Sequence, residues 1–85
     1  MSLEIEWTKP AAQDFRRLDR PIAQRVKEAV ERLAQIGHGD IKQLKGSGGE
    51  RRLRVGDWRV RFERDDAAKK IRILHVLHRR EAYRE

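Results

Sequence analysis

The sequence contains no cysteine, which excludes disulfide bonds and metal sites built on thiolates. A chain without cysteine fits a reducing compartment. Long hydrophobic runs are missing too, and no stretch approaches the roughly 20 apolar residues that a membrane-spanning helix needs. The first residues alternate charged and apolar side chains instead of forming the apolar core of a signal peptide. We therefore expect a soluble, cytoplasmic protein.

The chain has more positively than negatively charged residues. Lys and Arg number 21 against 14 Asp and Glu, which gives a formal net charge of +7 over 85 residues. A field of this sign favours polyanionic partners, either nucleic acids or acidic proteins. Most cations of the second half are arginines, whose planar guanidinium groups bind phosphate through two parallel hydrogen bonds and stack on bases.

A single domain over residues 1–85 is expected from the length. Its first half is predicted to hold one strand and two helices. Apolar and charged residues alternate over 3–7, the pattern of a strand with one buried face. Helical spacing of apolar residues then predicts a short helix from about residue 10 to 18 and a long helix over 21–36. So short a connection makes the two helices an antiparallel hairpin.

The second half is predicted to hold a loop and three strands. Residues 37–49 include five glycines and are predicted to be a loop. Alternation predicts strands over 52–55 and 58–63, joined by a two-residue turn. A nearly continuous apolar run over 71–77 predicts a central strand. The order β-α-α-β-β-β indicates an α+β fold, with helices packed on one face of a mainly antiparallel four-stranded sheet.

Strand alternation separates the two faces of this sheet. One face is apolar and is expected to meet the helices: Leu53, Val55, Trp58, Val60 and Phe62. The other is expected to be an open surface of arginines with a single acid: Arg52, Arg54, Arg59, Arg61 and Glu63. Such crowding of like charge is unfavourable by itself. It predicts a phosphate-binding surface, and the alternative is a solvated face balanced by acids nearby.

The histidines offer little support for a metal site. His75 shares the parity of Ile71 and Ile73, which predicts an interior histidine. The three histidines are scattered and lack a supporting acidic cluster, so neither a metal nor another cofactor is expected.

Two motifs carry a resemblance to a known family. Residues 52–63 are Arg-Leu-Arg-Val-Gly-Asp-Trp-Arg-Val-Arg-Phe-Glu, and residues 78–84 are His-Arg-Arg-Glu-Ala-Tyr-Arg. Together with the element order, they resemble the RelE/ParE superfamily of toxins from toxin–antitoxin pairs, and more closely the RelE branch. The resemblance implies a metal-independent endoribonuclease that cleaves messenger RNA, in many members on the ribosome, by attack of a ribose 2′-hydroxyl on the adjacent phosphate. It also implies inhibition of translation and an acidic antitoxin protein as partner.

The resemblance assigns roles to single residues. Arg52 and Arg54 match two basic strand positions, which are lysines in the best-known members. Arg59 matches the arginine that clamps the phosphate, Arg79 an arginine assigned to the leaving group or to charge stabilisation, and Tyr83 a tyrosine assigned to proton abstraction or base stacking. The implied RNA-binding surface comprises Arg52, Arg54, Arg59, Arg61, Arg79 and Arg80.

The identity of the general base stays open. Arginine does not lose its proton near neutral pH, so Arg52 and Arg54 are expected to act through their charge alone. The resemblance favours Tyr83 as the base. Chemistry favours His78, because an imidazole ring titrates near neutral pH, and Glu81 is the third candidate.

Two other functions remain as alternatives. A ParE-like toxin would inhibit DNA gyrase by binding it, which requires no phosphate-cleaving site. The third possibility is a catalytically inactive module of the same fold that only binds nucleic acid or the antitoxin. Arginines in place of lysines at the two strand positions favour that reading.

Overall fold

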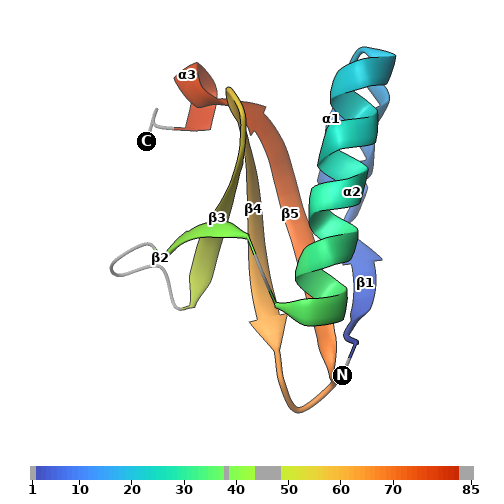
Figure 1. Cartoon of the computed structure of the whole chain (residues 1–85), viewed down its shortest axis with the longest axis vertical. Helices are drawn as coiled ribbons and strands as arrows, with labels where there is room; N and C mark the ends of the chain where they lie inside the picture. The colour runs from blue at the N-terminus through green and yellow to red at the C-terminus, as the bar shows by residue number, and fades with distance from the viewer. Residues whose placement is uncertain (1, 38, 44–48, 83–85) are drawn as a thin grey trace.

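The computed structural model describes residues 2–37, 39–43 and 49–82 of the chain (Figure 1). The elements follow one another as β1 (Glu4–Trp7), α1 (Lys9–Arg16), α2 (Arg20–Ile36), β2 (Asp40–Gln43), β3 (Glu50–Val55), β4 (Trp58–Asp65), β5 (Lys70–His78) and α3 (Arg79–Ala82). The five strands form one sheet in the order β1-β5-β4-β3-β2, in which only the β1–β5 pair is parallel. The predicted α+β class is confirmed.

The strand count differs from the prediction because β2 lies where a loop was expected. Its sequence, Asp-Ile-Lys-Gln, has one apolar residue and therefore too little alternation to indicate a strand. Pairing with β3 makes it one, since Ile41 lies opposite Leu53. A Cβ atom at Gly39 would lie 2.6 Å from Leu53 Cδ1, so a glycine allows this close entry into the strand. The segment after β5 begins with the short helix α3.

The two long helices begin and end where local chemistry favours it. Thr8 caps α1, because its Oγ1 accepts a hydrogen bond from the Ala11 amide (3.4 Å). The same hydroxyl donates to the Ile73 carbonyl (2.7 Å), which ties the start of α1 to β5. Gly37 ends α2 with φ at 71°, in the left-handed region that glycine tolerates. No helix among the described residues is both long and apolar enough to cross a membrane.

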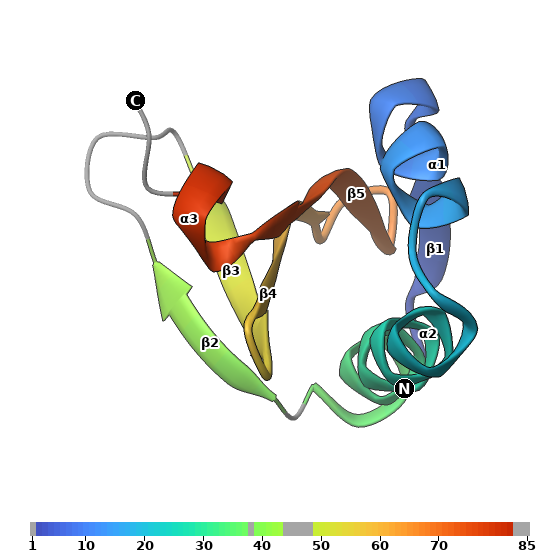
Figure 2. The same ribbon diagram turned by 90° about the horizontal axis from the view of Figure 1, so that it is seen from above.

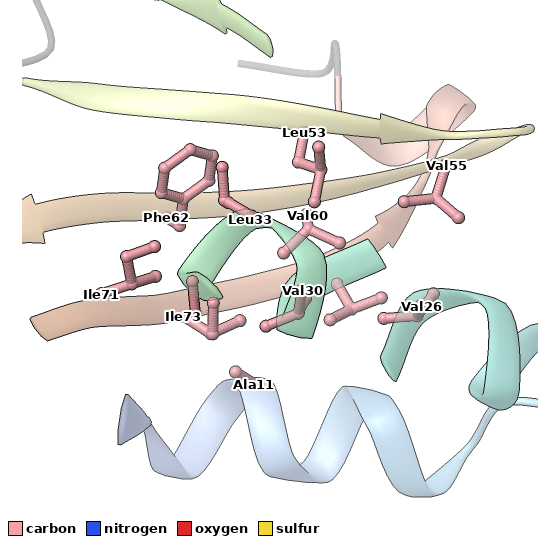
Figure 3. Close-up of a cluster of buried hydrophobic side chains, with 12 residues drawn as sticks. Ala11, Val26, Val30, Leu33, Leu53, Val55, Val60, Phe62, Ile71 and Ile73 are labelled. Carbon is pink, nitrogen blue, oxygen red and sulfur yellow. The ribbon is translucent and has the colours of Figure 1, made fainter. Parts of the chain in front are cut away.

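The core lies between α2 and one face of the sheet (Figure 3). Val26, Val30 and Leu33 of α2 pack with the predicted apolar positions of β3 and β4, and Leu53, Val60 and Phe62 are at most 1% exposed. Figure 2 shows α2 on this side of the sheet, α3 on the opposite side, and α1 beyond the end of β1. The opposite side of the sheet thus remains for the charged residues.

A bulge in β5 changes which side its residues occupy. Arg61 pairs with His75, whereas the next residue, Phe62, pairs with Ile73, so that Leu74 is an extra residue. His75 therefore lies on the side of Arg61 instead of sharing the side of Ile73. Its side chain is 42% exposed. The prediction of an interior histidine was wrong, because it assumed an unbroken alternation along β5.

Candidate nucleic-acid interface

The sheet side opposite α2 carries arginines that face one another across a ladder. Arg52 lies directly opposite Arg61, and Arg54 directly opposite Arg59. Such partners have Cβ atoms about 4.5–5.5 Å apart, so four arginine side chains start from one small area of the sheet. We call these two cross-strand pairs the arginine rows. The predicted gathering of these four residues on one side is confirmed.

Strand β2 extends one arginine row with a cation that the sequence did not reveal. Lys42 lies opposite Arg52 and is exposed. The row then runs from Lys42 through Arg52 and Arg61 to His75, across four strands. Only the placement of Lys42 on a strand brings it here, because a loop assignment gave its side chain no defined direction.

The arginines differ in how far they reach solvent. Arg54 is exposed, whereas Arg52 and Arg59 are only 8% and 9% exposed, so the expected open surface is open only in part. Arg59 Nη1 donates to the carbonyl oxygens of Gly56 and Trp58, each at 2.9 Å. These bonds attach its guanidinium to the hairpin turn that precedes it. Arg59 is thus held in one orientation before any ligand binds.

A second cross-strand row on the same side is rich in acids. It comprises Glu50, Glu63, Arg72 and Glu6, and we call it the carboxylate row. Arg72 donates to Glu63 (2.9 Å) and to Glu6 (3.2 Å), and Lys70 donates to Glu6 (3.2 Å). Glu50 also accepts from Arg61 Nε (2.6 Å), so Glu63 is not the only acid on this side as the sequence suggested.

These contacts shift the acid–base behaviour of the carboxylate row. The hydrogen bond from Lys70, followed by that from Arg72, holds the pKa of Glu6 below its ordinary value of 4.5. The hydrogen bond to Glu63, followed by that to Glu6, raises the pKa of Arg72 above its ordinary value. Both shifts favour the charged forms. The three carboxylates are thus all paired with cations, with Arg72 inside the row and Lys70 and Arg61 beside it.

Helix α3 brings two more predicted cations to the hairpin turn. The Arg79 amide donates to the Asp57 carbonyl (2.8 Å), and Arg79 Nη1 lies 3.9 Å from Asp57 Oδ1. Arg79 has a 59% exposed side chain, and Arg80 is exposed as well. Both residues therefore start beside the turn that joins the strands of the arginine rows.

The predicted general bases are not gathered with these cations. His78 lies opposite Trp58 on the ladder, and the two rings meet edge-on with centroids 5.3 Å apart. Trp58 has the parity of the buried Val60, so His78 lies on the α2 side of the sheet, away from Arg59. Glu81 is exposed on α3. Tyr83 lies outside the described residues.

Sequence reasoning missed a histidine–carboxylate pair on the arginine side. His75 Nδ1 lies 3.1 Å from Asp14 Oδ2, and the same oxygen accepts a hydrogen bond from the Val76 amide (3.0 Å). The side chain of Asp14 is only 17% exposed. No signal in the sequence connects these residues, because the bulge that turns His75 outward depends on pairing with β4. Within the described ranges, no three His, Cys, Asp or Glu side chains gather as they would around a metal ion.

A family model and several solved structures are similar to this chain. The family model described as the ParE toxin of a type II toxin–antitoxin system, parDE, matches residues 5–83. No curated protein sequence matches significantly. The fold is similar to a RelBE toxin–antitoxin complex from Mycobacterium tuberculosis, with 26% identity, a TM-score of 0.81, and coverage of 92% of this chain and 99% of that one.

Two further solved structures extend the comparison. A RelB–RelE antitoxin–toxin complex from Methanococcus jannaschii matches with 27% identity and a TM-score of 0.76, over 92% of this chain and 94% of that one. A chromosomal ParDE system from Pseudomonas aeruginosa matches with 20% identity and a TM-score of 0.67, over 91% and 96% of the two chains. The last likeness concerns the fold alone.

Proposed function

We propose that this chain, which belongs to the ParE toxin family of the RelE/ParE superfamily and is thus a toxin of toxin–antitoxin type, is an endoribonuclease. It cleaves messenger RNA on the translating ribosome and thereby inhibits translation. The observation that carries the proposal is the pair of arginine rows, Arg52 with Arg61 and Arg54 with Arg59, on one side of the sheet. A side on which arginine faces arginine would complement the closely spaced phosphates of RNA.

The proposed reaction is attack of a ribose 2′-hydroxyl on the neighbouring phosphate. Negative charge develops on the phosphorane oxygens, and donors that are already oriented stabilise it most effectively. Arg59 meets this requirement, because two backbone carbonyls hold its guanidinium in place. In this scheme guanidinium groups supply the positive charge, and no metal ion takes part.

The predicted arginines and Tyr83 each have a place in this scheme. Arg59 clamps the phosphate, and the more exposed Arg79 lies at the leaving oxygen. Arg52 and Arg54 contribute charge only, since guanidinium groups keep their protons. Arg61 and Arg80 contact the RNA backbone, and Tyr83 stacks on a base or accepts a proton, as the family resemblance suggests.

We further propose that an acidic antitoxin holds the toxin inactive. The net charge of +7 favours an acidic partner. An apolar cleft between β1, α1 and α2 is lined by Ile5, Trp7, Phe15 and Val30, and also by the cations Arg16 and Lys27 and the acid Glu31. An antitoxin segment with apolar anchors and flanking acids would complement it. Recovery of no small acidic protein with the tagged toxin from its native host would contradict this.

The test of the ribonuclease proposal is to map messenger RNA 5′ ends before and after induced expression. Arg79→Ala serves as the control variant. New 5′ ends that follow the codon phase, and that disappear with Arg79→Ala, are the expected result. Intact messages in cells that still stop growing would instead support gyrase inhibition, which the description of the matched family model as a ParE toxin keeps in view. Intact messages with normal growth would indicate an inactive binding module.

A further inference from the structure

His75 occupies the β5 end of the row that begins with Lys42 and continues through Arg52 and Arg61. The bulge at Leu74 turns it to this side, and its side chain is 42% exposed. The His75 imidazole thus starts from the strand next to Arg61. Its row is adjacent to the row that contains Arg59. Of the groups proposed so far as bases, neither His78 nor Glu81 lies within these rows.

Asp14 fixes the orientation of this imidazole. Strand β1 stops pairing at Trp7, opposite Ile73, so the Val76 amide faces the edge that α1 covers. There it donates to Asp14 Oδ2 (3.0 Å), and this oxygen also meets His75 Nδ1 (3.1 Å). A carboxylate can only accept, so a neutral His75 carries its proton on Nδ1. The lone pair then resides on Nε2, as a general base requires.

We propose that His75 is the general base of the cleavage reaction and that Asp14 is its positioning residue, an inference that rests on the ribonuclease function proposed above. The Nε2 lone pair takes the 2′-hydroxyl proton while the 2′-oxygen forms a bond to phosphorus. The bond between phosphorus and the 5′-oxygen breaks, its electron pair stays on that oxygen, and water protonates it. The products are a 2′,3′-cyclic phosphate and a free 5′-hydroxyl, and the imidazolium returns its proton to the hydroxide.

The surroundings of His75 suit this role. Asp14 from α1 contacts His75, and Arg61 from β4 lies opposite it across the ladder. Arg61 is itself paired with Glu50 of β3 at 2.6 Å, so its charge is partly compensated. As the base takes up a proton, the Asp14 carboxylate stabilises the imidazolium, in the same arrangement that serine proteases use for their histidine.

The experiment is single-turnover cleavage of a defined messenger on purified translating ribosomes, over a range of pH. The test variants are His75→Gln, which keeps a donor for Asp14 but cannot take the proton, and His75→Ala. Gln24→Ala, an exposed change on α2, is the control, and His78→Ala tests the rival base. We expect the cleavage rate to fall about 10²–10⁴-fold in both His75 variants and to stay near that of the wild type in the control.

Further readouts separate catalysis from structure. Added imidazole should partly restore cleavage by His75→Ala. In the wild type the cleavage rate should rise with pH on the acidic side of its profile, and this rise should disappear in His75→Gln. Asp14→Asn should lower the rate about 10–100-fold, as loss of an orienting partner does. Thermal melting and RNA affinity should show that each variant is folded and binds substrate.

The outcomes distinguish this inference from the function beneath it. A wild-type toxin that cleaves, together with a folded His75→Gln that cleaves equally fast, would overturn the role of His75 and leave the ribonuclease proposal intact. A wild-type toxin that cleaves no message on the ribosome would overturn both.

Discussion

Two neighbouring parts of one sheet side differ in how they arrange charge. In the carboxylate row, Arg72 faces Glu6 and Glu63 and donates a hydrogen bond to each. In the arginine rows, the register sets arginine opposite arginine. Opposite charges across a ladder stabilise a sheet, and like charges destabilise it. The first part therefore has the arrangement expected of a surface that serves stability, and the second that of a surface that serves a polyanionic ligand.

The largest effect that would test this comparison is expected from Arg59. Arg59→Ala removes a guanidinium held by the Gly56 and Trp58 carbonyls. Loss of one such oriented donor costs about 10²–10³-fold in rate, and cleavage on translating ribosomes would measure it. Arg59→Lys keeps the charge without the rigid fork, so its rate should fall between those of the wild type and Arg59→Ala. A folded Arg59→Ala that cleaves like the wild type would show that the arginine rows are not the catalytic surface.

The two sides of the sheet were predictable from the sequence because alternation is a local signal. Leu53 and Val60 pair in the core and Arg54 and Arg59 pair outside it, as their positions along two clean strands predict. A glycine turn that fixes the hairpin register makes such a pattern reliable.

The remaining part of the site depends on pairing between distant segments, which the sequence does not encode locally. Lys42 joins the surface only because β3 recruits β2 as an edge strand. His75 joins it only because β5 carries one residue more than β4 at the bulge. A one-residue shift moves a side chain to the other face, and this is why His75 was assigned to the interior.

The salt dependence of RNA affinity tests whether the arginine side binds phosphate. Each phosphate contact to single-stranded RNA contributes about 0.7 to the slope of log affinity against log salt concentration. Arg54→Ala and Lys42→Ala remove exposed cations of the arginine side, and each should lower the slope by about this amount. Fluorescence anisotropy with a short RNA would measure it, with Lys27→Ala on α2 as a control of equal charge. Equal slopes in all three variants would mean that net charge alone binds RNA.

Removing a negative charge from the carboxylate row should leave the cleavage rate unaffected. Glu63→Gln removes the partner that holds Arg72 at 2.9 Å. Because the pair is partly exposed, with side chains 32% and 40% accessible, its contribution to stability should be small and should fall with added salt. We expect a slightly lower melting temperature at low salt and an unchanged cleavage rate. A marked loss of cleavage would remove the functional distinction between the two rows.

The smallest expected effect is the pH dependence of stability that Glu6 confers. Its pKa in the folded protein is below the ordinary value of 4.5, mainly through the hydrogen bond from Lys70. Its contribution is therefore fully present above that value and is lost as the pH falls through the folded pKa. Melting temperatures of the wild type and Glu6→Gln should differ most near neutral pH and converge on acidification.

Lys70→Ala provides the matched background for this measurement. Without the first of its hydrogen-bond donors, Glu6 should keep a smaller shift in pKa. Without Lys70, only Arg72 holds the Glu6 carboxylate. Adding Glu6→Gln to Lys70→Ala should therefore change the melting temperature less than adding Glu6→Gln to the wild type. An equal difference in both backgrounds would mean that Lys70 does not couple to Glu6, and that the carboxylate row is less tightly compensated than its distances imply.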